Sequence, residues 1–270
     1  MAEVKNLVVV RAGDASLHPS WLAAEKGARN WRLHISYFGK RPAPYGDLPE
    51  GVGLSHEAGS KYHGLAACLA KFPDWLDRYE RIAFPDDDLQ ASRGGWSEVF
   101  DILAEANAPL GQPSLDPLSF FSHPVTLCRP RYRYRETDFI EVMAPVFRTD
   151  LLKQCLPLFT ENVTSWGLDY LFARQARENG GSMAIVDAVN FLHTRRVGKG
   201  DQYKPGEISP REDRKRTLAR HGIQIYEGRA VRGIRADGGV DGAFRARFGV
   251  SRAFLNKWLV DFLGANTVMR

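Results

Sequence analysis

The chain has 270 residues, with 44% hydrophobic and 11% aromatic side chains and a formal net charge of +5 at pH 7. This composition supplies a sizeable core and excludes a chain that is disordered throughout. No apolar run reaches the roughly 18–20 residues that span a bilayer, and the first residues lack the features of a secretory signal peptide. Three widely spaced cysteines exclude a disulfide framework and, with the missing signal, predict a cytoplasmic protein.

The charge is distributed unevenly along the chain. Residues 1–194 carry 20 Lys and Arg against 24 Asp and Glu, a net charge of −4, whereas residues 195–270 carry 17 against 8, a net charge of +9. A basic C-terminal third is typical of proteins that meet nucleic acid, anionic lipid or a phosphorylated ligand. Because no nucleic-acid recognition motif is present, we expect no specific nucleic-acid partner.

The first 80 residues predict strands that alternate with helices. Residues 7–10 are a β-branched apolar run that predicts a buried strand, and residues 31–38 alternate imperfectly as a second strand. Residues 40–59 are rich in Pro and Gly and predict a loop. Residues 60–79 have the apolar spacing of a helix, which Pro73 interrupts.

The next segment ends in three consecutive carboxylates. Residues 82–84 predict a short buried strand, and Asp86, Asp87 and Asp88 follow at its carboxyl end. In open α/β sheets ligands bind at the carboxyl ends of the strands, and hard carboxylate oxygens suit Mg²⁺ or Mn²⁺ together with a substrate phosphate. The alternative for this run, taken alone, is an acidic turn with solvated charges.

Residues 97–198 continue the alternation. The pattern predicts extended structure at 122–148, a strand at 183–186 and helices at 97–106, 149–159 and 166–178. Within the extended stretch, the alternating Arg and Tyr of 129–135 favour a charged edge strand over a stacking surface. The whole pattern indicates an α/β architecture, a central sheet flanked by helices.

A change of character predicts two parts, a domain at 1–198 and a basic, mostly helical extension at 199–270. Residues 210–221 predict a surface helix, and four glycines within 233–242 predict a flexible joint. Residues 245–263 combine an amphipathic helix with basic side chains, which suits a peripheral contact with the inner face of a membrane. The alternative, which we favour, is a terminal helix docked on its own domain or on a dimer partner; the oligomeric state stays open.

His193 is the candidate that completes a metal site with the aspartates. It follows the strand predicted at 183–186, just as the aspartates follow theirs, so both reach the same sheet edge. A neutral imidazole with carboxylates is a reasonable Mn²⁺ ligand set. A lone His after an apolar stretch is otherwise a satisfied core histidine.

Two helix starts carry further candidates. Trp166, Gly167 and Asp169 begin one helix, where an indole beside a flexible Gly suits a sugar platform and the carboxylate suits a general base. The plain alternative is an acidic residue that stabilises the helix dipole. Lys61 begins another helix, where a cation is unfavourable unless an anionic phosphate lies nearby. For Lys61 alone, a solvated surface lysine is the favoured interpretation.

An ordered set of motifs across residues 5–198 resembles a known family. The matching stretches are 59–61, 79–89, 112–117, 139–147, 166–169 and 185–187 leading to His193. The chain resembles the family of unknown function labelled as related to lysine-ketoglutarate reductase trans-splicing. That family is itself similar to nucleotide-sugar glycosyltransferases of the GT-A type. Residues 199–270 match nothing in this pattern.

The resemblance implies a fold and a set of ligands. The fold is a GT-A-like, Rossmann-like mixed central sheet flanked by helices, and the cofactor is Mn²⁺ or Mg²⁺. Asp86 and Asp88 would bind the metal and the sugar-nucleotide donor, with Asp87 in the variable middle position, and His193 would complete the metal shell.

The resemblance also assigns the remaining site residues. Asp169 would deprotonate the acceptor hydroxyl as the catalytic residue. On the donor side, Val10 and Arg11 would meet the base and Lys61 would face the diphosphate. The acceptor would be bound by Trp166, Gly167 and Glu141.

We therefore expect a metal-dependent glycosyltransferase that moves a sugar from a nucleoside-diphosphate sugar to a glycan or other hydroxyl acceptor. With an Asp base, a single displacement would invert the anomeric centre. A role in polysaccharide biosynthesis rests on analogy between folds. The alternative is a non-catalytic module that binds a glycan or nucleotide-sugar on a degenerate transferase fold. A metal-dependent phosphohydrolase is disfavoured because acidic ligands for a second metal are lacking.

Overall fold

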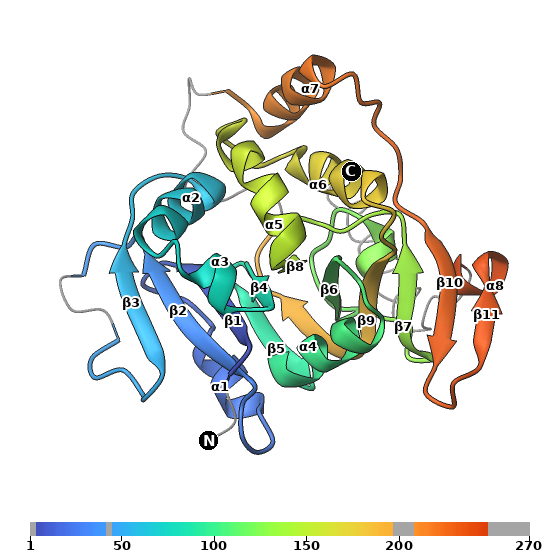
Figure 1. Ribbon diagram of the computed structural model, residues 1–270, viewed down its shortest axis with the longest axis horizontal. Coiled ribbons are helices and arrows are strands. Elements are labelled where there is room, and N and C mark those ends of the chain that lie inside the picture. Colours follow the sequence, from blue (N-terminus) through green and yellow to red (C-terminus); the bar gives the residue numbers. More distant parts are fainter. Residues whose placement is uncertain (1–3, 42–44, 197–207, 248–270) are drawn as a thin grey trace, which may run out of the picture.

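A single mixed sheet organises the chain (Figure 1). The structure is a computed structural model that describes residues 4–41, 45–196 and 208–247. Eleven strands form the sheet in the order β11-β10-β7-β9-β6-β8-β4-β1-β2-β3, and β5 pairs with β9 beside this path. The strands are β1 Asn6–Ala12, β2 Trp31–Tyr37, β3 Val52–His56, β4 Arg81–Ala83, β5 Leu89–Arg93, β6 Leu110–Leu115, β7 Tyr132–Thr137, β8 Val146–Arg148, β9 Met183–His193, β10 Ala230–Arg235 and β11 Val240–Gly242.

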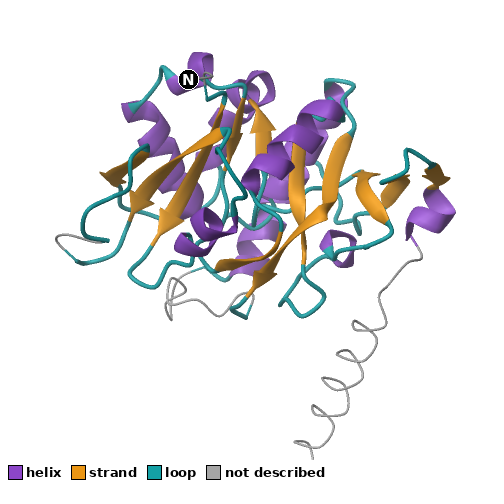
Figure 2. Ribbon diagram, turned by 90° about the horizontal axis from the view of Figure 1, so that it is seen from below, coloured by secondary structure: helices purple, strands orange, loops and turns teal. Residues whose placement is uncertain are grey.

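Helices lie on both faces of the sheet (Figure 2). The helical segments are α1 Pro19–Ala24, α2 Lys61–Lys71, α3 Trp75–Arg78, α4 Trp96–Glu105, η1 Pro124–Thr126, α5 Thr149–Cys155, η2 Leu156–Thr160, α6 Leu168–Glu178, α7 Pro210–Arg220 and α8 Ala243–Arg247. None of the described helices is long and apolar enough to cross a bilayer.

The strand period of two builds a separate core on each face. In β1, Leu7 and Val9 point to one face and pack with α2, α3, α5 and α6. Val8 and Val10 point to the other face and pack with α1 and α4. Because both faces of β1 are buried, its sequence is a continuous apolar run rather than an alternating one.

Parallel and antiparallel pairings are combined in a way that fixes where ligands can approach. β4, β1, β2 and β3 are mutually parallel, as are β6 and β9, whereas β8 runs antiparallel between β4 and β6. Beyond the end of β4, Asp86 forms an isolated parallel bridge with Arg11. The aspartate run therefore emerges at the carboxyl edge of the parallel strands, as the sequence predicts.

The elements with the clearest sequence patterns are confirmed, and strands with weak patterns were not predicted. The strands predicted at 7–10, 31–38 and 82–84 correspond to β1, β2 and β4, and the helices predicted at 97–106 and 166–178 correspond to α4 and α6. The loop predicted at 40–59 contains β3, and β5 and β6 were not predicted as strands.

The prediction that 129–135 forms an edge strand is wrong, because β7 lies between β9 and β10 inside the sheet. Arg135 and Asp187 explain how a basic segment is buried there. Both side chains are fully buried and form two parallel bonds, Nε to Oδ2 at 2.7 Å and Nη2 to Oδ1 at 2.9 Å. Arg135 also donates to the carbonyls of Val125 and Leu127, so each of its three guanidinium nitrogens has an acceptor.

The segment 233–242 is not the flexible joint that its glycines predict, because β10 and β11 form an antiparallel hairpin there. β10 pairs with β7, so the central sheet continues into the residues assigned to the extension. The surface helix predicted at 210–221 corresponds to α7. The domain boundary at residue 198 stays a prediction, and the amphipathic helix predicted at 245–263 lies almost wholly outside the described residues.

Arg135→Met is expected to lower the free energy of unfolding by about 3–5 kcal/mol, because it leaves the Asp187 carboxylate buried without its partner. Arg133→Met is the matched control on the same strand. Its ion pair with Glu105 is exposed and contributes about 0–1 kcal/mol. Urea denaturation measures both variants, and equal losses would contradict the assignment of Arg135 as a buried anchor.

Candidate functional site

The aspartate run is fastened to the turn that follows β1. Oδ2 of Asp87 accepts a hydrogen bond of 2.8 Å from the backbone N–H of Gly13, and the carbonyl of Asp87 accepts one of 2.7 Å from Leu17. Oδ1 of Asp87 lies 3.6 Å from Arg195. Asp87 therefore holds the turn after β1 in place. This agrees with its position in the middle of the run, between the two candidate metal ligands Asp86 and Asp88. Burial raises the pKa of Asp87 to about 6.

The pairing of β5 with β9 joins the aspartates to His193. Leu89 lies opposite His193 in the antiparallel register, and Thr194 donates to the carbonyl of Asp88 through both its N–H and its hydroxyl. As a result, Nε2 of His193 lies 3.3 Å from Oδ2 of Asp88, across more than a hundred residues of chain. α1 holds β5 in place, because the indole of Trp21 donates to the carbonyl of Leu89.

The imidazole of His193 is held in one orientation. Nδ1 lies 2.6 Å from the carbonyl of Phe120 and the backbone N–H donates to the hydroxyl of Ser119. Because a carbonyl can only accept, Nδ1 carries the proton and Nε2 faces Asp88. Burial disfavours the charged ring, but the hydrogen bond and the charge of Asp88 outweigh it and raise the pKa of His193 to about 9.

Asp88 and His193 have the chemistry of a divalent-cation site. Oδ1 of Asp88 is buried and has no hydrogen-bond partner, which is costly unless something fills the place. A ring nitrogen opposite a carbonyl-bound Nδ1 is the usual arrangement of a ligating His. Among the described residues no three His, Cys, Asp or Glu side chains are close enough to hold an ion together. Two protein ligands with open positions still suit Mg²⁺ or Mn²⁺, which retain waters and substrate phosphates.

Asp86, the remaining aspartate of the run, forms an ion pair with Lys61. Its ammonium lies 2.6 Å from Oδ1 of Asp86 and donates to the carbonyls of Val142 and Met143 at 2.6 and 3.1 Å. These three acceptors match the three N–H donors of an ammonium group. The interpretation of Lys61 as a solvated surface lysine is wrong, and Asp86 is the anion that compensates for a cation at the start of α2. Its predicted contact with a diphosphate stays a prediction.

The two donor-side residues on β1 are buried. The side chain of Val10 is fully enclosed in the core. The guanidinium of Arg11 donates to the hydroxyl of Ser36 at 2.9 Å and to the carbonyls of Glu57 and Gly59 at 3.1 and 2.9 Å. Arg11 thereby ties the carboxyl end of β1 to β2 and to the turn before α2. In this arrangement their side chains stabilise the sheet edge, and their role toward a nucleotide base stays a prediction.

Asp169 lies in the first turn of α6 and is buried. Burial raises the pKa of its carboxyl to about 7, against the opposing hydrogen bond that Oδ1 accepts from the N–H of Tyr170 at 3.0 Å. Oδ2 lies 3.8 Å from Nε2 of His123, whose pKa burial lowers to about 4. A neutral imidazole beside a carboxyl that titrates near neutrality is suited to proton transfer.

Glu141 is a second buried carboxyl near Asp169. Oε2 of Glu141 is buried without a hydrogen-bond partner. Burial, and then the nearby charge of Asp169, raise the pKa of Glu141 to about 8, with an opposing contribution from His193. The charges of Asp169, His193 and Asp86 thus all act on Glu141, which places it near predicted residues of both the catalytic and the metal site.

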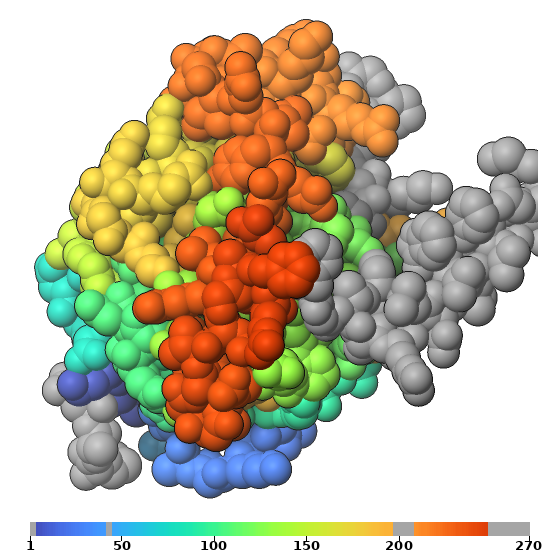
Figure 3. Space-filling model, turned by 90° about the vertical axis from the view of Figure 1, so that its right-hand side faces the viewer, coloured from blue at the N-terminus to red at the C-terminus, as the bar shows by residue number. Residues whose placement is uncertain are grey.

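Trp166 and Gly167 come directly before α6, which carries Asp169, and α7 lies against them. Figure 3 shows α7 beside α6 on this face of the molecule. The guanidinium of Arg214 lies 5.6 Å from the centre of the Trp166 ring. Gly167 has φ +96°, and a Cβ at this position would lie 3.2 Å from Cγ of Arg214. Only a glycine combines this conformation with such a close approach.

Sequence reasoning missed His123, Arg214 and Ser119. Arg214 lies in the helix predicted at 210–221, but its approach to Trp166, like the places of His123 and Ser119, depends on tertiary packing. The net charge of +9 in residues 195–270 was the one signal that pointed toward Arg214.

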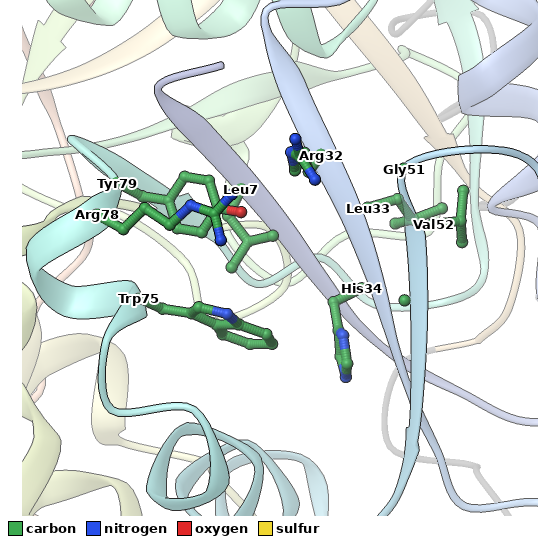
Figure 4. A pocket seen from close by; sticks show the side chains of 10 residues that line it. Leu7, Arg32, Leu33, His34, Gly51, Val52, Trp75, Arg78 and Tyr79 are labelled. Atoms are coloured by element: carbon green, nitrogen blue, oxygen red, sulfur yellow. The ribbon is translucent and has the colours of Figure 1, made fainter. Parts of the chain in front are cut away.

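A separate pocket lies at the opposite end of the strands (Figure 4). It has a volume of about 260 Å³ and is lined by the first half of β1, β2 and β3 and by Trp75, Arg78 and Tyr79 of the α3 region. Leu7 in this pocket is four residues before Arg11, or about 13 Å along β1. The pocket is therefore remote from the aspartates.

The fold matches solved glycosyltransferase structures. A structure of GalNAc-T7 with UDP, GalNAc and Mn²⁺ superposes with a TM-score of 0.57 at 8% identity, over 81% of this chain and 48% of that one. A structure of S. aureus TarS, residues 1–349, in complex with UDP-GlcNAc superposes with a TM-score of 0.51 at 14% identity, over 79% of this chain and 64% of that one. The chain thus spans about half to two thirds of the length of these two relatives.

No protein-family model matches the sequence, and no curated protein matches it. The resemblance to the family of unknown function therefore stays a prediction. At identities this low, the structural similarity concerns the fold alone. The fold of this chain is GT-A-like, as the sequence motifs predict.

Asp169→Asn is expected to change how stability depends on pH. Because the pKa of Asp169 is raised on folding from about 3.9 to about 7, its contribution is fully present below about pH 4 and lost as the pH rises to about 7. The free energy of unfolding of the variant, relative to the wild type, should therefore rise across this window by roughly 4 kcal/mol at most.

Urea denaturation at pH 4.5 and pH 8 measures this difference. Asp150→Asn is the control. Its ion pair with Arg148 lowers the pKa of Asp150, so the contribution of Asp150 is fully present above about pH 4. This variant should therefore differ from the wild type by the same amount at both pH values. A parallel response of the two variants would exclude a buried, proton-binding Asp169.

Proposed function

We propose that this chain is a metal-dependent glycosyltransferase that moves a sugar from a nucleoside-diphosphate sugar to a hydroxyl acceptor. The observation that carries the proposal is the pair formed by Asp88 and His193. The imidazole is fixed from behind by Phe120, the carboxylate has one buried oxygen without a partner, and both lie at the carboxyl edge of a GT-A-like sheet. The UDP and Mn²⁺ in the GalNAc-T7 structure support the proposal of a metal-dependent glycosyltransferase.

Asp88 and His193 would hold Mn²⁺ or Mg²⁺, which when bound neutralises the charge that develops on the departing nucleoside diphosphate. Asp86 is held by Lys61, so in the described arrangement it keeps the run in position rather than offering a free carboxylate. Lys61 also links this run to residues 142–143, directly after Glu141. Lys61 thus connects the aspartate run on the proposed donor side to the segment that carries Glu141 on the proposed acceptor side.

Asp169 would take the proton from the acceptor hydroxyl. A carboxyl with a pKa near 7 is partly ionised at neutral pH and has enough basicity to accept a proton, which is the balance that general-base catalysis favours. Trp166 would contact the acceptor sugar with its ring, and Glu141 would be protonated at pH 7 and able to donate a hydrogen bond. Attack assisted by Asp169 inverts the anomeric centre.

The alternative is a binding module without turnover on the same fold. The pairing of Asp86 with Lys61 favours it, because the aspartate run then has one carboxylate less for a cation. Calorimetry with UDP-sugars distinguishes the two functions. Binding without transfer or hydrolysis, across a panel of hydroxyl acceptors, would indicate the module.

Asp88→Asn and His193→Ala are each expected to weaken Mn²⁺ binding at least tenfold, because each removes one of two protein ligands. The paramagnetic resonance of free Mn²⁺ measures binding directly, without an assay of activity. Asp77→Asn, an exposed carboxylate on α3, is the control and should bind as the wild type does. Unchanged Mn²⁺ binding in both variants would remove the metal site from the proposal.

Asp169→Asn is expected to retain donor binding and to lose turnover by about 10²–10⁴-fold, the usual contribution of a general base. In the wild type, turnover should rise with pH through about 7 as Asp169 ionises. Donor binding is measured by thermal shift with UDP-sugars and Mn²⁺, and turnover by release of UDP. A variant with normal turnover would show that Asp169 is not the base.

A further inference from the structure

We infer that the acceptor carries an anionic group, a carboxylate or a phosphate, which Arg214 binds beside Trp166. This inference rests on the proposed function, since it places the anion on the substrate that Asp169 deprotonates. It adds a residue from the basic C-terminal part of the chain to the site.

Arg214 has no counter-ion among the described residues. Nε of its guanidinium is buried and has no hydrogen-bond partner. No ion pair joins it to Asp169, although its charge lowers the pKa of both Asp169 and His123. Two other arginines of α7 are paired, Arg216 with Glu212 and Arg220 with Glu161. A guanidinium that lies over an indole and forms no ion pair within the described residues is arranged to receive an anion.

The position of Arg214 is fixed by the packing of α7. Ser209 caps the start of α7, and its hydroxyl accepts from the N–H of Glu212 at 3.2 Å. Oδ2 of Asp213 accepts from the N–H groups of Val163 and Thr164 at 3.1 and 2.8 Å. These bonds attach α7 to the loop that leads into Trp166, so the residue next to Asp213 is held against the indole.

A second set of bonds fixes the far side of the same loop. Asn162 donates to the hydroxyl of Thr217 at 3.0 Å and to the carbonyl of Trp166 at 2.8 Å. Leu218 is buried in the core that contains Leu168 and Phe172 of α6. The cation is therefore preorganised, and little ordering entropy is lost when an anion binds.

The chemistry of the guanidinium selects the class of ligand. Its planar fork matches the two oxygens of a carboxylate or phosphate, and the side chain is only partly buried where it lies over Trp166. Because the centre of the Trp166 ring lies 5.6 Å from the guanidinium of Arg214 and Trp166 precedes Asp169 by three residues, a sugar that contacts Trp166 would bring an acidic substituent to Arg214 while its hydroxyl approaches the base. A neutral sugar would leave the cation without a partner.

The test is a titration of the full chain with small probes, followed by NMR of the Trp166 indole N–H and without donor or metal. The probes are glucuronic acid, glucose 6-phosphate, inorganic phosphate and glucose. We expect the two acidic sugars to bind more tightly than glucose, and Arg214→Gln to weaken them by roughly ten- to a hundredfold. The better of the two acidic sugars identifies the anion.

Arg211→Gln is the matched control, because Arg211 is exposed on the same helix and the change in charge is the same. It should bind the acidic sugars within about twofold of the wild type. Arg214→Lys retains the charge and the stem and should bind with intermediate affinity, which separates loss of the fork from loss of folding.

Three results would overturn the inference: acidic sugars that bind no better than glucose, equal losses in Arg214→Gln and Arg211→Gln, or inorganic phosphate that binds as tightly as both acidic sugars. Because the titration uses neither donor nor metal, its failure would leave the transferase proposal standing. Failure of Mn²⁺ binding or turnover would leave the anion site standing.

Discussion

The antiparallel pairing of β5 with β9 is the contact on which the candidate site depends. It places Leu89 opposite His193 and so brings the ring within 3.3 Å of Asp88. β9 also pairs with β6 and β7, which makes it a rigid central strand. β5 is short and is held from outside by Trp21. The site is thus formed where the short strand β5 pairs with β9, which other strands of the sheet hold in place.

Buried charge is the second organising constraint. Arg135 and Asp187 are enclosed together on β7 and β9, and Arg11 is enclosed at the end of β1 with carbonyls as partners. Hydrogen bonds to Arg135 and Asp187 offset the cost of desolvation, whereas Arg11 has acceptors for its other two nitrogens but keeps its Nε buried without a partner. Asp88, Glu141 and Arg214 each have a buried polar atom without a partner as well. These three atoms lie in the region where a ligand is proposed, although other unpartnered atoms, such as Nε1 of Trp96, lie in the scaffold.

The local sequence pattern predicted the elements in which tertiary packing agrees with the local preference of the chain. The apolar run at 7–10 predicts a buried strand directly, whereas the aspartates after 82–84 also allowed a solvated acidic turn until the strand before them was considered. β6 was hidden because Gly111 and Pro113 weaken a strand prediction, and β3 because its residues are half exposed and do not alternate. The role of Lys61 could not be read from sequence, since it depends on carbonyls 81 and 82 residues away. The proximity of Arg214 to Trp166 likewise arises only from packing.

Gly167 connects two charged groups that the sequence separates by 45 positions. Its left-handed backbone starts the helix that carries Asp169, and its missing side chain lets the stem of Arg214 approach. Any larger residue would at once strain the left-handed backbone at position 167 and displace the side chain of Arg214. Acceptor preference in related chains could therefore diverge through this one uncharged position, with both the base and the arginine retained.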